Sequence, residues 1–170
     1  HVLAMMLALG HNLPGFFHLQ QQNTWMAGKS KNYIPGELRG ATIGIVGYGS
    51  IGRQVARLAH GFGARVLAIK RDLKQLQDNE YVPENMGDPE GVLFTRLYPP
   101  QALRSMLREC DYVVVTVPLT PQTKGMLAEK HLKEMKPTAY LIDVSRGGVV
   151  DQHALLDVLQ HKYIAGAALD

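Results

Sequence analysis

The chain has 170 residues, of which 46% are hydrophobic and 19% are charged. This composition suits one folded domain with its own core and argues against a disordered tail or a fibrous repeat. The net charge of +3 is too small to indicate a nucleic-acid binder, and the single Cys110 excludes an internal disulfide and a cysteine-rich zinc site.

The first segment, residues 1–9, is an apolar run that begins at His1 without an initiator Met. It is too short to span a membrane and lacks the basic flank of a signal peptide, so it predicts a largely buried helix. The apolar side chains of such a helix must be buried, either against the rest of the domain or against a partner subunit. Residues 23–40 are polar, are interrupted by Gly and Pro, and are interpreted as a connector.

From residue 41 onward, apolar strand-like runs alternate with helical patterns. Strands are expected at 41–46, 65–69, 92–97, 112–117, 139–144 and 164–169. Helices are expected at 53–62 (ended by Gly61 and Gly63), at 101–109, at 128–135 and after Asp151, which can cap the last one. Residues 72–91 are interpreted mainly as a loop. The alternation predicts an α/β Rossmann-type fold, a doubly wound parallel sheet between two helical layers.

The motif that carries chemistry is Gly47-Tyr-Gly49-Ser-Ile-Gly52, which lies between a predicted strand and a predicted helix. In that context G-x-G-x-x-G indicates a dinucleotide site. Gly47 is expected to make the tight turn, Gly49 to let a pyrophosphate approach the backbone, and Gly52 to let helix and strand pack closely. The alternative is a structural turn that binds no nucleotide.

The position that recognises the ribose lies at the end of the second strand, where an acidic residue would serve NAD. This chain has Lys70 and Arg71 there, and no acidic residue occurs between Glu37 and Asp72. The same window holds six cations, namely Arg39, Arg53, Arg57, Arg65, Lys70 and Arg71. Two cations at the strand end suit a 2′-phosphate, so we expect NADP to be preferred and NAD to be possible. In the alternative, both cations are solvated and Asp72 turns inward to serve NAD.

Three further stretches complete a pattern: residues 111–125 (DYVVVTVPLTPQTKG), 132–151 (LKEMKPTAYLIDVSRGGVVD) and 165–170 (AGAALD). With the glycine motif they resemble the NAD(P)-binding domain of the D-isomer-specific 2-hydroxyacid dehydrogenases. The resemblance extends from the opening helix to Asp170.

The resemblance implies a role for Arg146, which matches the family's active-site arginine. That arginine binds the substrate carboxylate and polarises the 2-keto oxygen, tasks that suit a planar cationic fork. Asp143 stands where the family often has Asn. Lys70 stands where NAD-specific members have Asp, which supports the preference for NADP.

The resemblance also implies cofactor contacts at matching positions. Ser50 and Ile51 match residues at the pyrophosphate, and Val117 and Pro118 match the segment that lines the adenosine side. Further matches are a threonine near the cofactor and residues near the nicotinamide ribose and carboxamide, which are Thr123, Val144 and Asp170.

The family's catalytic histidine and its partner glutamate lie beyond the position that matches Asp170, and none of the seven histidines fits that motif. The substrate domain would precede His1 and return after Asp170. We therefore expect a cofactor domain from a larger enzyme that reversibly reduces a 2-keto acid to a D-2-hydroxy acid. The domain alone should bind nucleotide without turnover, and no metal site is indicated.

The opening segment, residues 1–22, matches a helix through which the family forms dimers. A homodimer is therefore expected, with Leu3, Met6, Leu7 and Leu9 at the interface.

We expect a cytoplasmic protein with neither a nucleic-acid nor a membrane partner. Two alternatives remain: a nucleotide-gated interaction module, like the corepressors that share this domain, or a relative that oxidises formate, phosphite or phosphoglycerate.

Overall fold

The computed structural model describes residues 1–25, 35–77 and 82–170. Six strands form one sheet in the order β3-β2-β1-β4-β5-β6, and every neighbouring pair is parallel. The strands are β1 Thr42–Val46, β2 Arg65–Ile69, β3 Arg96–Tyr98, β4 Tyr112–Val115, β5 Tyr140–Asp143 and β6 Gly166–Leu169. The predicted Rossmann-type fold is confirmed.

Helices cover both faces of the sheet. Helices α1 (Val2–Gly10) and α3 (Ser50–Gly61) pack on one face, against side chains that include Ile43 and Ile45. The other face, which includes Val113 and Leu141, is covered by α4 (Leu103–Leu107), α5 (Glu129–Leu132) and α6 (Gln152–Gln160). Every residue of β1 and β4 is buried, because a parallel sheet between two helical layers has no solvated face.

The predicted helix boundaries are confirmed where a specific residue defines them. The Asp151 carboxylate accepts hydrogen bonds from the N–H groups of His153 (3.0 Å) and Ala154 (3.1 Å), which caps α6. Helix α3 ends at Gly61 and is followed by Gly63 at a φ of 74°, the left-handed conformation that ends helices.

Several predicted elements differ in the structure. The helix expected at 53–62 begins at Ser50, the strand expected at 112–117 ends at Val115, and the helix expected at 128–135 covers only Glu129–Leu132. Strand β3 covers Arg96–Tyr98 rather than 92–97, because the Asp88 carboxylate accepts the N–H groups of Val92 and Leu93 and holds them in a turn. The predicted helix 101–109 is a 3-10 turn, η2 (Pro100–Ala102), followed by α4. The predicted connector and the predicted loop each lie partly outside the described residues, at 26–34 and 78–81.

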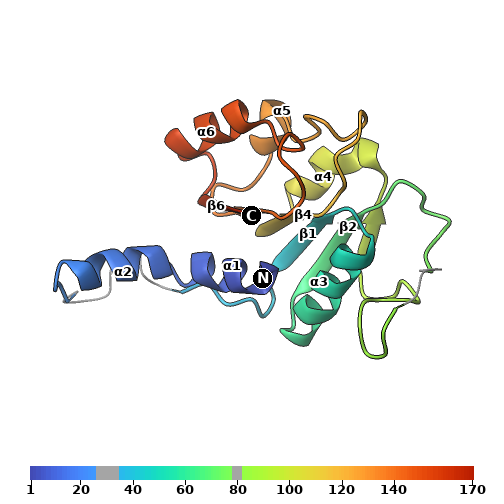
Figure 1. The fold of residues 1–170 in the computed structure, drawn as a ribbon, viewed down its shortest axis with the longest axis horizontal. Helices are drawn as coiled ribbons and strands as arrows, with labels where there is room; N and C mark the ends of the chain where they lie inside the picture. Colours follow the sequence, from blue (N-terminus) through green and yellow to red (C-terminus); the bar gives the residue numbers. More distant parts are fainter. Residues whose placement is uncertain (26–34, 78–81) are drawn as a thin grey trace.

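The N-terminal segment forms two helices, because the chain bends by 62° between α1 and α2 (Leu13–Gln21). Met6 is fully buried in its own domain, so its expected place at a subunit interface is wrong. Instead, α2 projects from the body of the domain (Figure 1) and has no buried residue. Among the described residues no single helix has the length and apolar character of a membrane span, although α1 and α2 together meet that test as a bent pair.

Candidate functional site

The predicted site residues meet at one edge of the sheet, because all the parallel strands end there. Strand order reverses between β1 and β4, and such a switch point is where open α/β sheets bind ligands. The glycine turn follows β1, and the cations of residues 70–71 follow β2. The ends of β4, β5 and β6 place here the other predicted residues, which are Val117, Pro118, Val144, Arg146 and Asp170.

The glycine turn is built on two close contacts and one open position. Gly47 has a φ of 106°, and a Cβ there would lie 2.7 Å from Cγ1 of Val117. A Cβ on Gly52 would overlap the carbonyl oxygen of Gly47 and lie 3.0 Å from Cγ2 of Ile45. At Gly49, in contrast, no described atom lies within 4 Å of a Cβ position. The backbone of Gly49 is therefore open to a ligand.

Gly49 is also the N-cap of α3, where it provides no side chain to satisfy the first N–H groups. Those N–H groups and the helix dipole favour an anion, and a diphosphate has the charge and the acceptor oxygens that they need. Ser50 and Ile51 begin the helix at this point, and Ile51 is 55% exposed. The turn and the start of α3 thus fit the diphosphate of a dinucleotide cofactor.

The end of β2 is joined directly to this turn. The carbonyl oxygen of Ile69 accepts hydrogen bonds from the N–H groups of Gly47 (3.2 Å) and Tyr48 (3.1 Å). Lys70 donates to the carbonyl oxygen of Gln75, while the side chain of Arg71 is exposed and makes no hydrogen bond or ion pair with the described residues.

The Asp72 carboxylate is exposed and accepts the N–H of Lys74 at 2.9 Å. The Asp72 carboxylate is therefore engaged within its own loop. The Arg71 side chain, in contrast, is exposed to solvent at the end of β2.

The six cations between residues 38 and 71 do not form one patch. Arg65 is the first residue of β2, so it lies at the amino ends of the strands, away from the glycine turn, and it pairs with Glu109 at 3.2 Å. Arg57 donates to the carbonyl oxygen of Gly87 at 2.5 Å, and Arg53 is 2% exposed. Arg53, Arg57 and Arg65 are therefore engaged by groups of the protein itself. Only the cations of residues 70–71 lie at the end of β2.

Two threonines order the backbone after β4. Thr116 Oγ1 donates to the carbonyl oxygen of Gly47 at 2.7 Å and ties this segment to the glycine turn. Thr123 Oγ1 donates to the carbonyl oxygen of Pro118 at 2.6 Å and accepts the N–H of Thr120 at 2.8 Å. Thr116 was missed in the sequence, where it lies within a long β-branched run.

The segment after β5 presents Arg146 beside a small cavity. Asp143 Oδ1 accepts hydrogen bonds from Ser145 N (2.9 Å) and Oγ (2.5 Å), which closes a tight turn. Arg146 Nη1 donates to the carbonyl oxygen of Ser145 at 2.8 Å, and the Asp170 N–H donates to the carbonyl oxygen of Asp143 at 2.9 Å. Both the turn and the end of β6 are thereby fixed next to each other.

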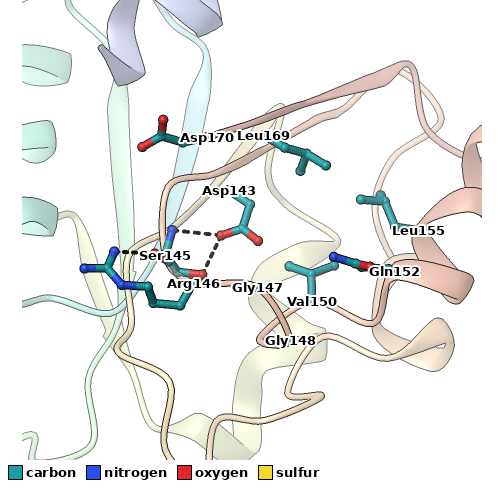
Figure 2. A pocket seen from close by; sticks show the side chains of 10 residues that line it. All are labelled: Asp143, Ser145, Arg146, Gly147, Gly148, Val150, Gln152, Leu155, Leu169 and Asp170. Atoms are coloured by element: carbon teal, nitrogen blue, oxygen red, sulfur yellow. Dashed lines mark hydrogen bonds between the residues drawn. The ribbon is translucent and has the colours of Figure 1, made fainter.

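The cavity has a volume of about 120 Å³ and lies between this turn, the start of α6 and the end of β6. Figure 2 shows Val150, Gln152 and Leu155 gathered on one side of it. The Arg146 guanidinium and the Asp170 carboxylate lie on the other side. A cationic fork thus stands at the carboxyl edge of the sheet, where it can bind a carboxylate.

A buried polar network behind the glycine turn was not found from the sequence. The Tyr48 hydroxyl donates to Asp88 Oδ2 at 2.6 Å, and the guanidinium of Arg53 lies 5.0 Å from the centroid of the Tyr48 ring. Burial, together with the bond to Asp88, raises the pKa of Tyr48 well above its ordinary value. Burial alone would also raise the pKa of Asp88, but the hydrogen bonds that its carboxylate accepts, with Arg53 nearby, lower it.

Residues 3–170 match the family model for the D-isomer specific 2-hydroxyacid dehydrogenase, NAD binding domain. A glyoxylate reductase of Pyrococcus furiosus is 38% identical over all of this chain and 47% of its own length. The chain spans less than half the length of the curated relatives that are most similar to it.

Solved structures agree with the family model. An NAD-complexed D-isomer specific 2-hydroxyacid dehydrogenase from Lactobacillus delbrueckii ssp. bulgaricus has a TM-score of 0.77 and 33% identity, over 99% of this chain and 47% of that one. An acyclic imino acid reductase in complex with NADPH and D-Arg has a TM-score of 0.78 and 26% identity, over 100% of this chain and 48% of that one. With the glycine turn and Arg146 in place, the chain belongs to the D-isomer specific 2-hydroxyacid dehydrogenase family and comprises its NAD-binding domain.

Proposed function

We propose that the full-length protein reversibly reduces a 2-keto acid to a D-2-hydroxy acid and that this domain holds its nicotinamide cofactor. The observation that carries the proposal is the position of Arg146, exposed at the same sheet edge as the glycine turn. When bound, the cofactor supplies or accepts the hydride.

The chain's own residues bind the cofactor and orient the substrate. The open backbone at Gly49 and the start of α3 hold the diphosphate, and the Val117–Pro118 segment lines the adenosine side. Val144 and Asp170, at the ends of β5 and β6, face the nicotinamide end, with Thr123 ordering the loop between the two regions. The Arg146 guanidinium holds the substrate carboxylate and stabilises charge that develops on the keto oxygen.

The test is Arg146→Ala in the full-length protein with glyoxylate, pyruvate and hydroxypyruvate as substrates. We expect kcat/KM to fall by about a hundredfold or more, because a charged bidentate contact is lost. Arg146→Lys should recover only part of the loss, because an ammonium is not a planar fork. The dissociation constant of the cofactor should stay unchanged in both variants.

An Arg146→Ala enzyme with full activity would contradict the assigned role. A full-length protein that binds nucleotide tightly but turns over none of the three acids would favour a nucleotide-gated interaction module.

We also propose that NADP is preferred over NAD. The support is electrostatic: Lys70 and Arg71 follow directly after Ile69, whose carbonyl oxygen is bonded to the glycine turn. A 2′-phosphate at the ribose would lie near these cations, whereas a carboxylate at that place would repel it.

A homodimer formed through the N-terminal helices is a further part of the proposal. Phe16 and Phe17 are 43% and 59% exposed on α2, which projects from the domain (Figure 1). A second copy of the chain would bury these rings.

We place the protein in the cytoplasm, where a reducing environment suits the buried free thiol of Cys110.

A further inference from the structure

The connection between β2 and β3 contains no helix in its described parts, residues 70–77 and 82–95. Irregular backbone cannot satisfy its own N–H and C=O groups, so other groups must do so. Helix α3 provides them. Arg57 donates to the carbonyl oxygen of Gly87 at 2.5 Å, and Gln54 accepts the N–H of Gly87 at 2.6 Å.

Arg53, one turn before Arg57 on α3, reaches both parts of the connection at once. Its guanidinium donates to the carbonyl oxygen of Leu76 at 2.6 Å and to the carbonyl oxygen of Asp88. The side chain is 2% exposed, and its planar fork suits two fixed acceptors in a way that a single ammonium does not.

Asp88 completes the contact on the other side. Its carboxylate, also in a residue that is 2% exposed, accepts the Tyr48 hydroxyl at 2.6 Å and the N–H groups of Val92 and Leu93 at 3.0 Å each. Tyr48 belongs to the glycine turn itself. We call Arg53, Asp88 and Tyr48 together the buried clamp.

The clamp fixes the segment that carries Arg71. Leu76 is held by Arg53 on one side and by close packing on the other, since a Cβ on Gly91 would lie 2.5 Å from the Leu76 carbonyl oxygen. From Leu76 the chain runs back through Gln75, whose carbonyl oxygen accepts Lys70 Nζ. Residues 70–76 therefore form a closed loop with one end on β2 and the other on the clamp.

We infer that Arg53 and Asp88 are positioning residues for cofactor discrimination: they hold the loop of residues 70–76 so that Arg71 meets an adenosine 2′-phosphate. The inference rests on the proposed preference for NADP. Neither side chain touches the nucleotide, because both are buried behind the glycine turn. Their effect reaches the ligand only through the loop.

The test compares dissociation constants of NADP⁺ and NAD⁺ for the wild-type chain and for Arg53→Lys. The lysine keeps the charge but cannot hold both carbonyl groups, so the loop loses its anchor at Leu76. We expect the dissociation constant of NADP⁺ to rise about tenfold and that of NAD⁺ to change less than about twofold. The ratio of the two affinities is a readout that a general loss of stability would not move.

Two further variants control the experiment. Arg57→Lys alters a neighbouring contact of α3 to Gly87 that does not reach Leu76, so the affinity ratio should stay at the wild-type value. Tyr48→Phe removes one hydroxyl and keeps the ring, which packs edge-on to Phe94 at 5.3 Å, and it should lower the ratio less than Arg53→Lys does. Thermal unfolding checks that each variant is folded.

The outcomes separate the two proposals. A wild-type chain that binds NAD⁺ more tightly than NADP⁺ overturns the NADP preference, and this inference with it. A wild-type chain that prefers NADP⁺, combined with an Arg53→Lys ratio equal to the wild-type one, overturns the inference alone. Equal weakening of both nucleotides in Arg53→Lys would also overturn it, because it would show only a structural role.

Discussion

Single residues at the carboxyl edge are placed by backbone hydrogen bonds rather than by sequence distance. The carbonyl oxygen of Ile69 joins the end of β2 to Gly47 and Tyr48, so the two residues that follow it stand beside the glycine turn. Arg65, only four positions before Ile69, lies at the other end of the strand and pairs with Glu109. Whether a cation lies near the glycine turn therefore depends on which end of β2 it occupies or follows.

Arg71→Ala tests this at the residue scale. Because Arg71 is exposed and makes no ion pair among the described residues, its loss should leave the fold intact. We expect the dissociation constant of NADP⁺ to rise about tenfold, with NAD⁺ nearly unaffected, as measured by titration of cofactor fluorescence or calorimetry. Lys130→Ala, an exposed cation on α5, is the matched control and should change neither constant. If Arg71→Ala and Lys130→Ala bind NADP⁺ with the same affinity, the proposed contact of Arg71 with the 2′-phosphate is contradicted.

At the scale of elements, the β1 strand is packed so closely that it has no room for one additional methyl group. A Cβ on Gly44 would collide with the Sγ of Cys110 and lie 3.1 Å from Cε of Met106. Cys110 is fully buried, and its thiol donates a hydrogen bond to the carbonyl oxygen of Met106 at 3.0 Å, so its side chain has little freedom to move. Burial also raises the pKa of this thiol to about 12, which keeps it unreactive.

Gly44→Ala should therefore lower the free energy of unfolding by about 1–3 kcal/mol, the usual cost of overpacking a core. Gly61→Ala is the control at the end of α3, where no described atom lies within 4 Å of a Cβ position. That change should be neutral or stabilise by up to about 1 kcal/mol, because alanine favours a helix. Urea denaturation measures both, and equal stabilities would refute the close packing.

The elements that the sequence predicted well are those whose residues alone decide their structure. β-branched runs such as 112–115 form a buried strand in any sheet of this kind, and Asp151 caps α6 through local bonds. The predicted start of β3 was wrong because the Asp88 carboxylate accepts the N–H groups of Val92 and Leu93, a contact that only the folded loop provides. The clamp was missed for the same reason: Arg53 and Asp88 are far apart in the sequence.

At the scale of the whole molecule, the domain has a compact body and a projecting α2. The sequence predicted an apolar N-terminal contact but assigned it in part to Met6, which the domain itself covers. An apolar run does not show which of its residues face inward until the sheet that it covers is known. The exposed aromatic rings lie one helix later, at Phe16 and Phe17.

A double substitution, Phe16→Asp with Phe17→Asp, should convert the proposed dimer to a monomer, since charges in an apolar interface are costly. Sedimentation velocity at micromolar protein measures the change. Leu156→Asp, at an apolar position on α6 that is 54% exposed, is the control and should leave the dimer intact. A wild-type chain that already sediments as a monomer would refute the proposed interface.

The parallel pairing of β1 with β4 has a consequence for folding kinetics. Gly44 pairs with Val113 at the centre of the sheet, and α3, β2, β3 and α4 all lie between these two residues in the sequence. Closing such distant contacts is slow, and the two sides of the sheet, β1 to β3 and β4 to β6, each consist of continuous sequence. A dinucleotide bound at the switch point would bridge these two sides. We expect this junction to form late in folding, so the bound dinucleotide would hold its two sides together and the bound domain should unfold more slowly than the free one.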